Sequence, residues 1–146
     1  MQIEISEDDA LTVEDFLTLA NLVWPRAYDA DRAAHALALA LTQNIVARAD
    51  QLLIGCVRIL SDGYFFGTIP EIMVHPSWRR QGIGRALIEV AWELSPTGLF
   101  FGAQPGNEPF FEQCGFERGL QSFQRRKPRG APTRTVPRTL EVTPSS

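Results

Sequence analysis

Residues Glu71 to Glu93 have the sequence EIMVHPSWRRQGIGRALIEVAWE, and this stretch decides the fold. Its apolar beginning predicts a strand, His75-Pro76 predicts a turn, and the spacing of apolar residues from Ile83 onward predicts an amphipathic helix at roughly Gln81 to Leu94. A basic, glycine-containing loop before a helix suits an anion, because the first helical N–H groups have no intrahelical partner and the helix dipole adds positive charge. We interpret the loop as a pyrophosphate-binding site.

Length and composition indicate one globular domain. The chain has 146 residues, of which 45% are hydrophobic and 21% charged, as is typical of soluble proteins. No run approaches the ~20 apolar residues that span a bilayer, and the acidic N-terminus lacks the features of a signal peptide. Cys56 and Cys114 show no metal-ligand spacing, so we expect reduced core thiols, a cytoplasmic location and no metal site.

Charge is distributed unevenly along the chain. Residues 1–124 carry 8 basic and 16 acidic residues, whereas residues 125–146 carry 6 basic and one acidic residue. An acidic body disfavours nucleic acid and a membrane surface as partners but suits a cationic small molecule. The basic end has no aromatic residue on which bases could stack, and we expect residues 128–146 to be an extended or disordered tail.

The residues before the central stretch predict a strand, two helices and a meander. Residues 2–6 alternate as in a short strand, residues 12–23 follow the Thr12 cap at helical spacing, and an Ala/Leu-rich helix follows Asp29 or Asp31 and reaches about Leu41. From residue 44 to Val74 we expect three antiparallel strands, with the last turn at Asp62-Gly63 and an irregularity at Pro70.

The residues after the central stretch predict a parallel strand and a short helix. Residues 99–103 (LFFGA) are an apolar run typical of a strand buried on both faces, which would complete a βαβ unit. Asn107 then caps a helix that ends at Gly115. We expect a last strand at residues 116–117, paired with residues 122–126.

Two motifs together resemble those of the GNAT superfamily of N-acetyltransferases. One is Arg79-Arg80-Gln81-Gly82-Ile83-Gly84, with the pattern R-x-x-G-x-G, and the other is the segment from Asn107 to Phe116, NEPFFEQCGF. The resemblance covers residues 2–126, within a domain of residues 1–127. It implies an α/β fold with a mixed, mostly antiparallel sheet that splays after the strand ending near Val74, and about four helices on both faces.

The resemblance also implies a cofactor and its contacts. Acetyl-CoA would lie in the split of the sheet, with the backbone of Met73 and Val74 along its pantetheine arm and Asn107 and Phe111 beside it. The pyrophosphate would be held by a segment flanked by Arg79 and Arg80, namely Gln81, Gly82, Ile83, Gly84, Arg85 and Ala86. An amine would attack the thioester directly, without an acyl-enzyme.

The catalytic acid and base are harder to assign. The family often has a tyrosine that protonates the leaving thiolate, and its counterpart here is Phe111, which has no proton to give. Another group, or water, would then take that role. Glu71 is the ionisable residue in the strand before the cofactor contacts, and it is a candidate base or, equally, a structural carboxylate, in which case water is the base.

The aromatic residues Trp24, Tyr28 and Tyr64 are candidates for the acceptor pocket, with ordinary core packing as the alternative. The leading hypothesis is an enzyme that acetylates a primary amine of a small molecule. The alternatives are a non-catalytic acyl-CoA-binding module, for which Phe111 argues, and a protein or peptide acetyltransferase, for which the basic tail argues. A sheet edge at the C-terminal strand could also pair in a homodimer.

Overall fold

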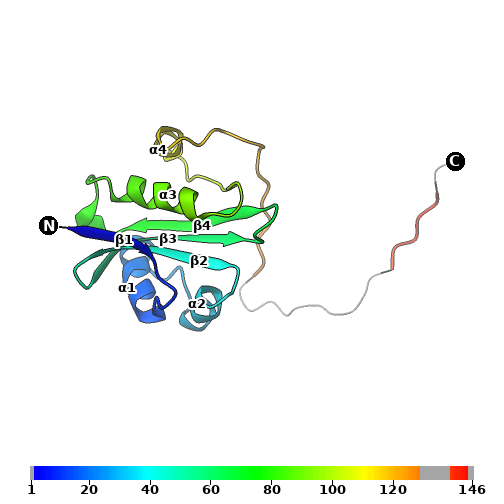
Figure 1. Ribbon diagram of the computed structural model, residues 1–146. Coiled ribbons are helices and arrows are strands. Elements are labelled where there is room, and N and C mark those ends of the chain that lie inside the picture. The colour runs from blue at the N-terminus through cyan, green and yellow to red at the C-terminus, as the bar shows by residue number, and fades with distance from the viewer. Residues whose placement is uncertain (1, 129–138, 145–146) are drawn as a thin grey trace.

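The computed structural model describes residues 2–128 and 139–144. Its centre is an antiparallel sheet in which each strand lies beside its neighbour in sequence (Figure 1). In order across the sheet, the strands are β1 (Ile3–Glu7), β2 (Thr42–Ala49), β3 (Leu52–Ser61) and β4 (Gly67–Val74). The predicted first strand and the predicted meander are therefore confirmed.

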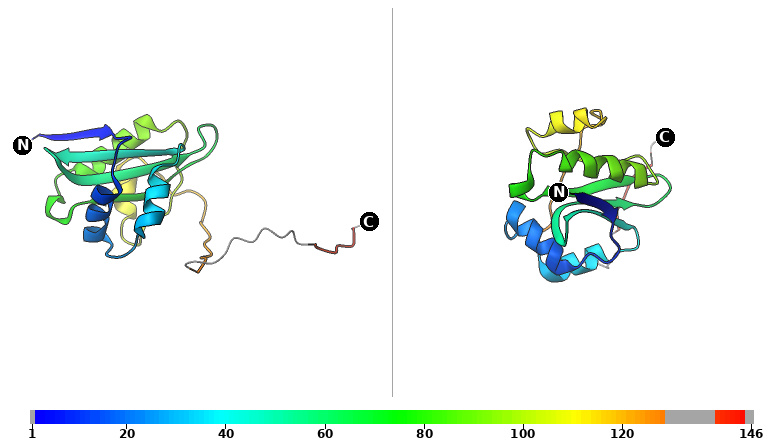
Figure 2. Two further views of the ribbon diagram at one scale, coloured as in Figure 1. Left: turned by 90° about the horizontal axis from the view of Figure 1, so that it is seen from below. Right: turned by 60° about the vertical axis from the view of Figure 1, so that its left-hand side comes forward.

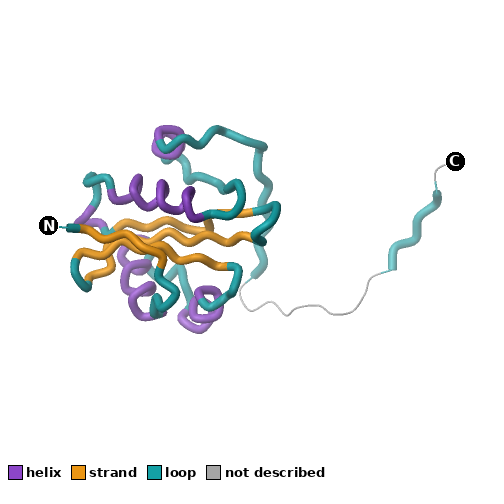
Figure 3. The backbone as a smooth tube through the Cα atoms, viewed as in Figure 1, coloured by secondary structure: helices purple, strands orange, loops and turns teal. Residues whose placement is uncertain are grey.

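Helices cover both faces of this sheet, as the tube in Figure 3 and the right-hand view in Figure 2 show. On one face lie α1 (Val13–Val23) and α2 (Ala30–Leu37), and on the other lies α3 (Ile83–Leu94). The short α4 (Glu108–Gln113) lies outside α3 (Figure 1). The predicted mixed α/β architecture with helices on both faces is confirmed.

The starts of α1 and α2 and the end of α4 lie at the residues that their caps predict. Thr12 and Asp29 each accept a hydrogen bond from the backbone N–H three residues later, at 3.1 and 2.9 Å, which satisfies an otherwise unpaired donor. Gly115 ends α4 with a φ of 91°. Its N–H donates to the Glu112 carbonyl and the next N–H donates to the Phe111 carbonyl, both at 3.1 Å, the pattern that a glycine after a helix makes possible.

Two apolar cores hold the helices to the sheet. One lies between the sheet and α3 and includes Leu87 and Ile88, and the other lies between the sheet and α1 and includes Phe16 and Leu19. Gly55 in β3 allows the close approach of α3, because a Cβ there would lie 2.9 Å from the Leu87 Cδ1 atom. A glycine inside a strand is typical of such a close approach.

A β-bulge interrupts β4 at the position that Pro70 predicts. Arg58 of β3 pairs with Glu71 and Leu60 pairs with Thr68, so two residues of β4 oppose one residue of β3. Proline cannot donate to the ladder, and a bulge is a place where that donor is not needed. After the bulge, Glu71 is turned toward the α1 side of the sheet, where it meets Tyr28.

Two predicted boundaries were wrong in the first half of the chain. The second helix ends at Leu37 rather than near Leu41, because the Thr42 N–H donates to the Leu39 carbonyl (3.0 Å) in a turn that leads into β2. The third strand of the predicted meander, β4, begins at Gly67 and not at Tyr64, the residue after the predicted Asp62-Gly63 turn. The Asp62 carboxylate accepts hydrogen bonds from the N–H groups of residues 64, 65 and 66, at 2.8, 2.8 and 3.0 Å, and so holds them in a loop.

The predicted strands after α3 were also wrong in extent. Residues 99–103 make a single parallel bridge, between Phe100 and Thr68, and the Phe100 side chain is 60% exposed rather than buried. The expected last strand pair at 116–117 and 122–126 is absent among the described residues. A strand needs a partner edge, and residues 121–128 are exposed throughout. Among the described residues, the parallel pairing predicted for this sheet is thus reduced to one bridge.

The predicted tail at residues 128–146 lies largely outside the described residues. Within it, residues 139–144 have no regular secondary structure. Across the described ranges, none of the helices combines the length and apolarity that crossing a membrane requires.

Candidate active site

The loop between β4 and α3 is a compact turn followed by an open, basic corner. His75 begins a 3-10 turn, Pro76–Trp78, and its Nδ1 atom accepts a hydrogen bond from the Ser77 N–H at 3.1 Å. Trp78 packs against the core under α3. Arg79 and the next three residues are exposed, so the corner is supported from below by Trp78 and open to solvent above.

The start of α3 presents unpaired donors at this corner. Gly82 caps the helix in the left-handed conformation, with a φ of 82°, and the cap has no side-chain hydrogen bond. The first hydrogen bond of the helix runs from the Ala86 N–H to the Gly82 carbonyl (3.0 Å), so the N–H groups of residues 83–85 precede it. Open space surrounds the position where a Gly82 Cβ would lie. These features fit a diphosphate group.

Three arginines surround the same corner with different roles. The Arg79 Nε–H donates to the Val74 carbonyl at 3.4 Å, which ties this side chain to the end of β4. Arg80 is exposed and has a φ of 64°. Arg85 is paired with Glu89 one helical turn later, at 3.1 Å, which offsets its charge. Arg79 and Arg80 are therefore the cations best placed to face an anion at this corner.

β4 is the last strand of the sheet, and its edge away from β3 is the outer edge. Among the described residues, this edge makes one parallel bridge, at Thr68, so the second half of β4 has no strand beside it there. The His75 N–H donates to the Ile54 carbonyl of β3 at 2.7 Å. Since the backbone groups of an antiparallel strand alternate in direction, those of Met73 face β3 and those of Val74 face the outer edge. The Val74 N–H can therefore pair with an extended ligand, whereas the Val74 carbonyl accepts the hydrogen bond from Arg79.

Helix α4 lies across from this edge. A Cβ on Gly84 would lie 3.4 Å from the Phe110 ring and 3.6 Å from the Val74 side chain, so β4, α3 and α4 converge at Gly84. Asn107 caps α4 without a side-chain hydrogen bond. The Phe111 ring packs edge-on against Phe110 and Phe101, at centroid distances of 5.1 and 4.8 Å. The position expected to carry a proton donor thus lies in an aromatic cluster.

On the other face of β4, Glu71 lies at the centre of a buried polar cluster. Its Oε2 and Oε1 atoms accept hydrogen bonds from the Nε and Nη2 groups of Arg58, at 2.6 and 2.9 Å. The Tyr28 hydroxyl donates to Oε1 at 3.2 Å. The side chain of Glu71 is 3% exposed and that of Arg58 is 13% exposed. Both carboxylate oxygens are therefore already engaged.

The cluster shifts the protonation of its members in a consistent way. Burial, followed by the charge and the hydrogen bond of Glu71, raises the pKa of Tyr28. Burial alone lowers the pKa of Arg58, but the hydrogen bond and charge of Glu71 outweigh this effect and raise it overall. Tyr28 is thus held as a neutral hydrogen-bond donor and Arg58 as a cation.

The adjacent Cys56 thiol gives an alkaline stability prediction. Burial, followed by the charge of Glu71, raises the pKa of Cys56 from 9.0 to about 12. Above pH 9 the unfolded thiol loses its proton while the folded thiol keeps it, so this residue lowers the free energy of unfolding by about 1.4 kcal/mol per pH unit. Urea unfolding from pH 8 to pH 11 should show this slope relative to Cys56→Ala; parallel curves would contradict it.

The structure brings together two of the three candidate acceptor residues. Tyr28 contacts Glu71, and Trp24 packs against the same core. Tyr64 lies apart from them, in the loop held by Asp62, and is 83% exposed. Sequence analysis missed Arg58, the main partner of Glu71. Pairing β3 with β4 about a five-residue loop places Arg58 opposite Pro70, and the bulge at Pro70 then shifts the register by one residue and places it opposite Glu71. The Asp62-Gly63 turn signal obscured this register.

Comparison with known proteins agrees with this geometry. Residues 41–118 match the model of the acetyltransferase (GNAT) domain. The chain is 34% identical, over an alignment 152 residues long, to a mycothiol acetyltransferase of Salinispora arenicola. The alignment covers 92% of this chain and 47% of that protein. A second relative, a probable acetyltransferase of Glycine max, is 31% identical over 136 residues. The chain spans about half the length of the curated relatives it matches, 47% and 52%.

Solved structures show the same fold. The structure of a putative acetyltransferase from Deinococcus radiodurans is 28% identical, with a TM-score of 0.70 over 85% of this chain and 88% of that chain. The aminoglycoside N-acetyltransferase AAC(6')-Iy, solved with a bisubstrate analogue that contains CoA, is 19% identical, with a TM-score of 0.69 over 87% of this chain and 99% of that chain. The match over residues 41–118, which includes β4, the basic loop, α3 and α4, shows that this chain belongs to the GNAT acetyltransferase family.

Proposed function

We propose that this protein transfers the acetyl group of acetyl-CoA to a primary amine of a small molecule. The observation that carries the proposal is the convergence of the open β4 edge, the unpaired amides of α3 and the cap of α4 around Gly84. Relatives named as mycothiol and aminoglycoside acetyltransferases support a small amine as the acceptor. The excess of acidic residues in 1–124 favours a cationic one.

Each binding element has a distinct task in this proposal. The N–H groups of residues 83–85 bind the pyrophosphate, and Arg79 and Arg80 offset its charge. The backbone of Val74 pairs with the pantetheine arm along the open edge, as an added strand would. Gly82 and Gly84 keep side-chain atoms out of the approach. When bound, acetyl-CoA supplies a thioester whose carbonyl carbon a neutral amine attacks while the thiolate leaves.

For Glu71, the contacts favour the structural alternative over the general base. A base must reach the proton it removes, but both Glu71 oxygens are engaged by Arg58 and Tyr28. We propose that Glu71 fixes Tyr28, and through it the α1–α2 connection, against β4. Water then takes the proton of the amine, and Trp24 and Tyr28 border the acceptor side. Tyr64 is too far out in its loop to share this role.

Binding and catalysis are tested by two measurements. Isothermal titration should show that acetyl-CoA and CoA bind to the protein, and an acetylation assay over pooled amines, polyamines and aminoglycosides should show transfer. Failure to bind either ligand would overturn the proposal. Binding without transfer to any amine would instead support a non-catalytic acyl-CoA-binding module, which the apolar setting of Phe111 favours.

Introducing a hydroxyl at the end of the Phe111 ring should accelerate the reaction. We expect Phe111→Tyr to raise kcat about tenfold, because a positioned acid can protonate the leaving thiolate, while KM for acetyl-CoA stays unchanged. Phe116→Tyr is the matched control, since Phe116 also packs on Phe101, at a centroid distance of 5.1 Å. Steady-state kinetics would contradict the prediction if both variants, or neither, gained activity.

A further inference from the structure

Three consecutive aromatic residues lie in the loop between β3 and β4. The side chains of Tyr64, Phe65 and Phe66 are 83%, 88% and 52% exposed. At ~200 Å² for each aromatic side chain, they leave roughly 450 Å² of mostly apolar surface in solvent. This area is in the range of the largest apolar patch on a typical monomer, and such a patch is often functional.

Hydrogen bonds hold this aromatic loop in one shape. The Asp62 carboxylate accepts from the N–H groups of the three aromatic residues, and the Asp62 N–H donates to the Phe66 carbonyl at 3.0 Å. The Ser61 hydroxyl oxygen accepts from the Gly63 N–H at 3.0 Å. Because the loop is already ordered, its aromatic side chains can meet a partner without the entropic cost of ordering the backbone. The three N–H groups also offset part of the negative charge of Asp62.

Two further segments lie at the same end of the sheet as the aromatic loop. Leu39 and Leu41, in the turn between α2 and β2, are each about half exposed. The Leu41 carbonyl accepts a hydrogen bond from the Ser61 N–H at 3.2 Å, directly beside the loop. The segment of residues 119–128 also leaves the body at this end (Figures 1 and 2). Apolar side chains from three parts of the chain therefore face solvent together.

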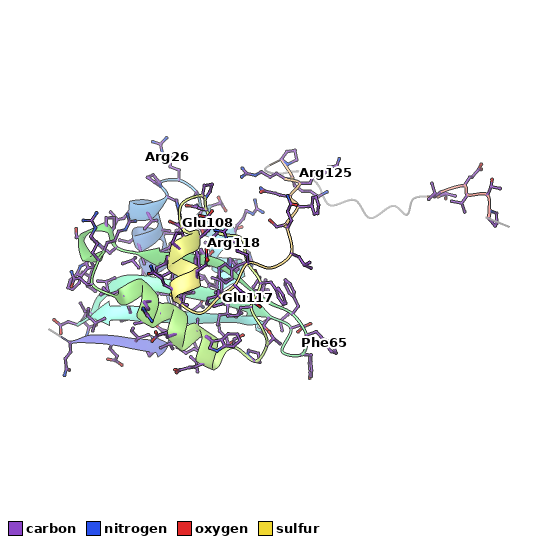
Figure 4. All side chains as sticks on the ribbon, turned by 90° about the horizontal axis from the view of Figure 1, so that it is seen from above. Arg26, Phe65, Glu108, Glu117, Arg118 and Arg125 are labelled. Atoms are coloured by element: carbon purple, nitrogen blue, oxygen red, sulfur yellow. The ribbon has the colours of Figure 1, made fainter. Side chains whose placement is uncertain are left out.

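This end of the molecule also carries a group of cations. Three consecutive basic residues, Arg125, Arg126 and Lys127, are exposed. Phe123, two residues before them, is almost fully exposed. Figure 4 places Phe65 and Arg125 at the same end, at the periphery of the molecule. Exposed aromatic rings beside exposed cations are complementary to a surface that is apolar below a layer of negative charge.

The acidic character of the body has little influence at this end. Residues 117–128 carry four basic residues and one acidic residue. Figure 4 shows Glu108, Glu117 and Arg118 gathered beside α4, inward from Phe65. Exposed charges act on their surroundings mainly within the Debye length, about 8 Å at physiological salt. The excess of carboxylates over residues 1–124 therefore argues against a membrane partner for the body as a whole, but not for this end.

We propose that this end of the molecule binds to an anionic lipid bilayer, with the aromatic loop at the level of the headgroups and residues 125–127 on the lipid phosphates. Aromatic rings favour the membrane–water interface, and each Lys or Arg near an anionic bilayer adds to the attraction. Stable attachment needs two such signals together. The loop projects from the end of the sheet (Figure 1), a shape that enters a fluid lipid surface without a matching pocket.

Co-sedimentation of the full chain with vesicles tests the attachment. We expect binding to vesicles of equal parts phosphatidylglycerol and phosphatidylcholine, and binding about tenfold weaker or less to pure phosphatidylcholine. Arg125→Gln, Arg126→Gln and Lys127→Gln in one variant should weaken binding to the anionic vesicles about a hundredfold. A wild type that does not bind the anionic vesicles, or a triple variant that binds them equally well, would overturn the proposal.

The contribution of the aromatic loop is measured by truncating its most exposed ring. We expect Phe65→Ala to weaken binding to the anionic vesicles about tenfold, because an apolar side chain then no longer leaves water. Leu22→Ala is the control, because Leu22 is about half exposed and lies on α1, away from the loop (Figure 1). Its binding should stay within about twofold of the wild type. Equal effects of the two variants would show that the loop does not contact the bilayer.

A tryptophan in the loop separates insertion from adsorption by charge alone. Relative to the wild type, Phe65→Trp should add an emission that moves to shorter wavelength on the anionic vesicles and is quenched by brominated acyl chains. Leu22→Trp should add an emission that the same vesicles leave unchanged. If neither emission is quenched, the loop does not insert and the proposal fails. A wild type that ignores vesicles but forms a dimer, which Phe65→Ala dissociates in light scattering, would overturn it in favour of a second copy.

Discussion

Replacing Arg58 with alanine should destabilise the domain by about 3–5 kcal/mol. The reason is that Glu71, with a side chain only 3% exposed, would keep its charge in the core with the Tyr28 hydroxyl as its remaining partner. Burial of an uncompensated carboxylate is far more costly than the net strength of the ion pair itself. The free energy of unfolding from urea titration at neutral pH measures the effect.

Two further variants show that the loss comes from the uncompensated charge. Arg85→Ala removes an ion pair whose side chains are 59% and 57% exposed, and we expect a change of less than about 0.5 kcal/mol. Arg58→Met combined with Glu71→Leu removes both charges, and we expect it to recover most of the stability, because apolar residues of similar volume replace buried ion pairs well. A double variant as unstable as Arg58→Ala would show instead that the loss of stability does not come from the uncompensated charge.

The features that sequence predicted well are those set by neighbours in the chain. The Thr12 cap, the Gly115 terminator and the irregularity at Pro70 each follow from the chemistry of one residue and its immediate backbone. The start of α3 belongs to the same class. It was predicted near Gln81 and lies at the Gly82 cap, whose left-handed φ of 82° suits glycine, and the exposed amides follow from helix geometry. The basic loop at this corner was therefore within reach of sequence analysis.

The features that sequence missed depend on distant parts of the chain. Arg58 and Glu71 are 13 residues apart and meet because the loop from Asp62 to Phe66 and the bulge at Pro70 together set the register of β3 and β4. Tyr28 joins them from 43 residues away. In the same way, residues 99–103 have the composition of a buried strand, but composition supplies no partner edge. Their pairing stops at Phe100 because no described segment lies along the other side.

Changing Gly84 to aspartate should separate folding from cofactor binding. An acidic residue in the first turn of α3 stabilises the helix dipole, and replacing a helical glycine adds helix propensity, so we expect stability to be unchanged or raised by up to about 1 kcal/mol. A Cβ at this position makes only ordinary contacts, 3.4 Å from Phe110 and 3.6 Å from Val74. The affinity for acetyl-CoA, in contrast, should fall. A carboxylate ~5 Å from a pyrophosphate charge costs roughly 3 kcal/mol at the dielectric of a protein surface.

That energy corresponds to a loss of acetyl-CoA affinity of about two orders of magnitude, which isothermal titration can measure. Gly119→Asp is the charge-matched control, because a Cβ there meets open space and the position lies outside the corner formed by Gly82 and Gly84. Its affinity for acetyl-CoA should stay within threefold of the wild type. If Gly84→Asp keeps or raises the free energy of unfolding but lowers the affinity for acetyl-CoA, the unpaired amides of α3 serve cofactor binding rather than folding. Equal affinity in both variants would instead place the cofactor elsewhere, however well the helix start suits an anion.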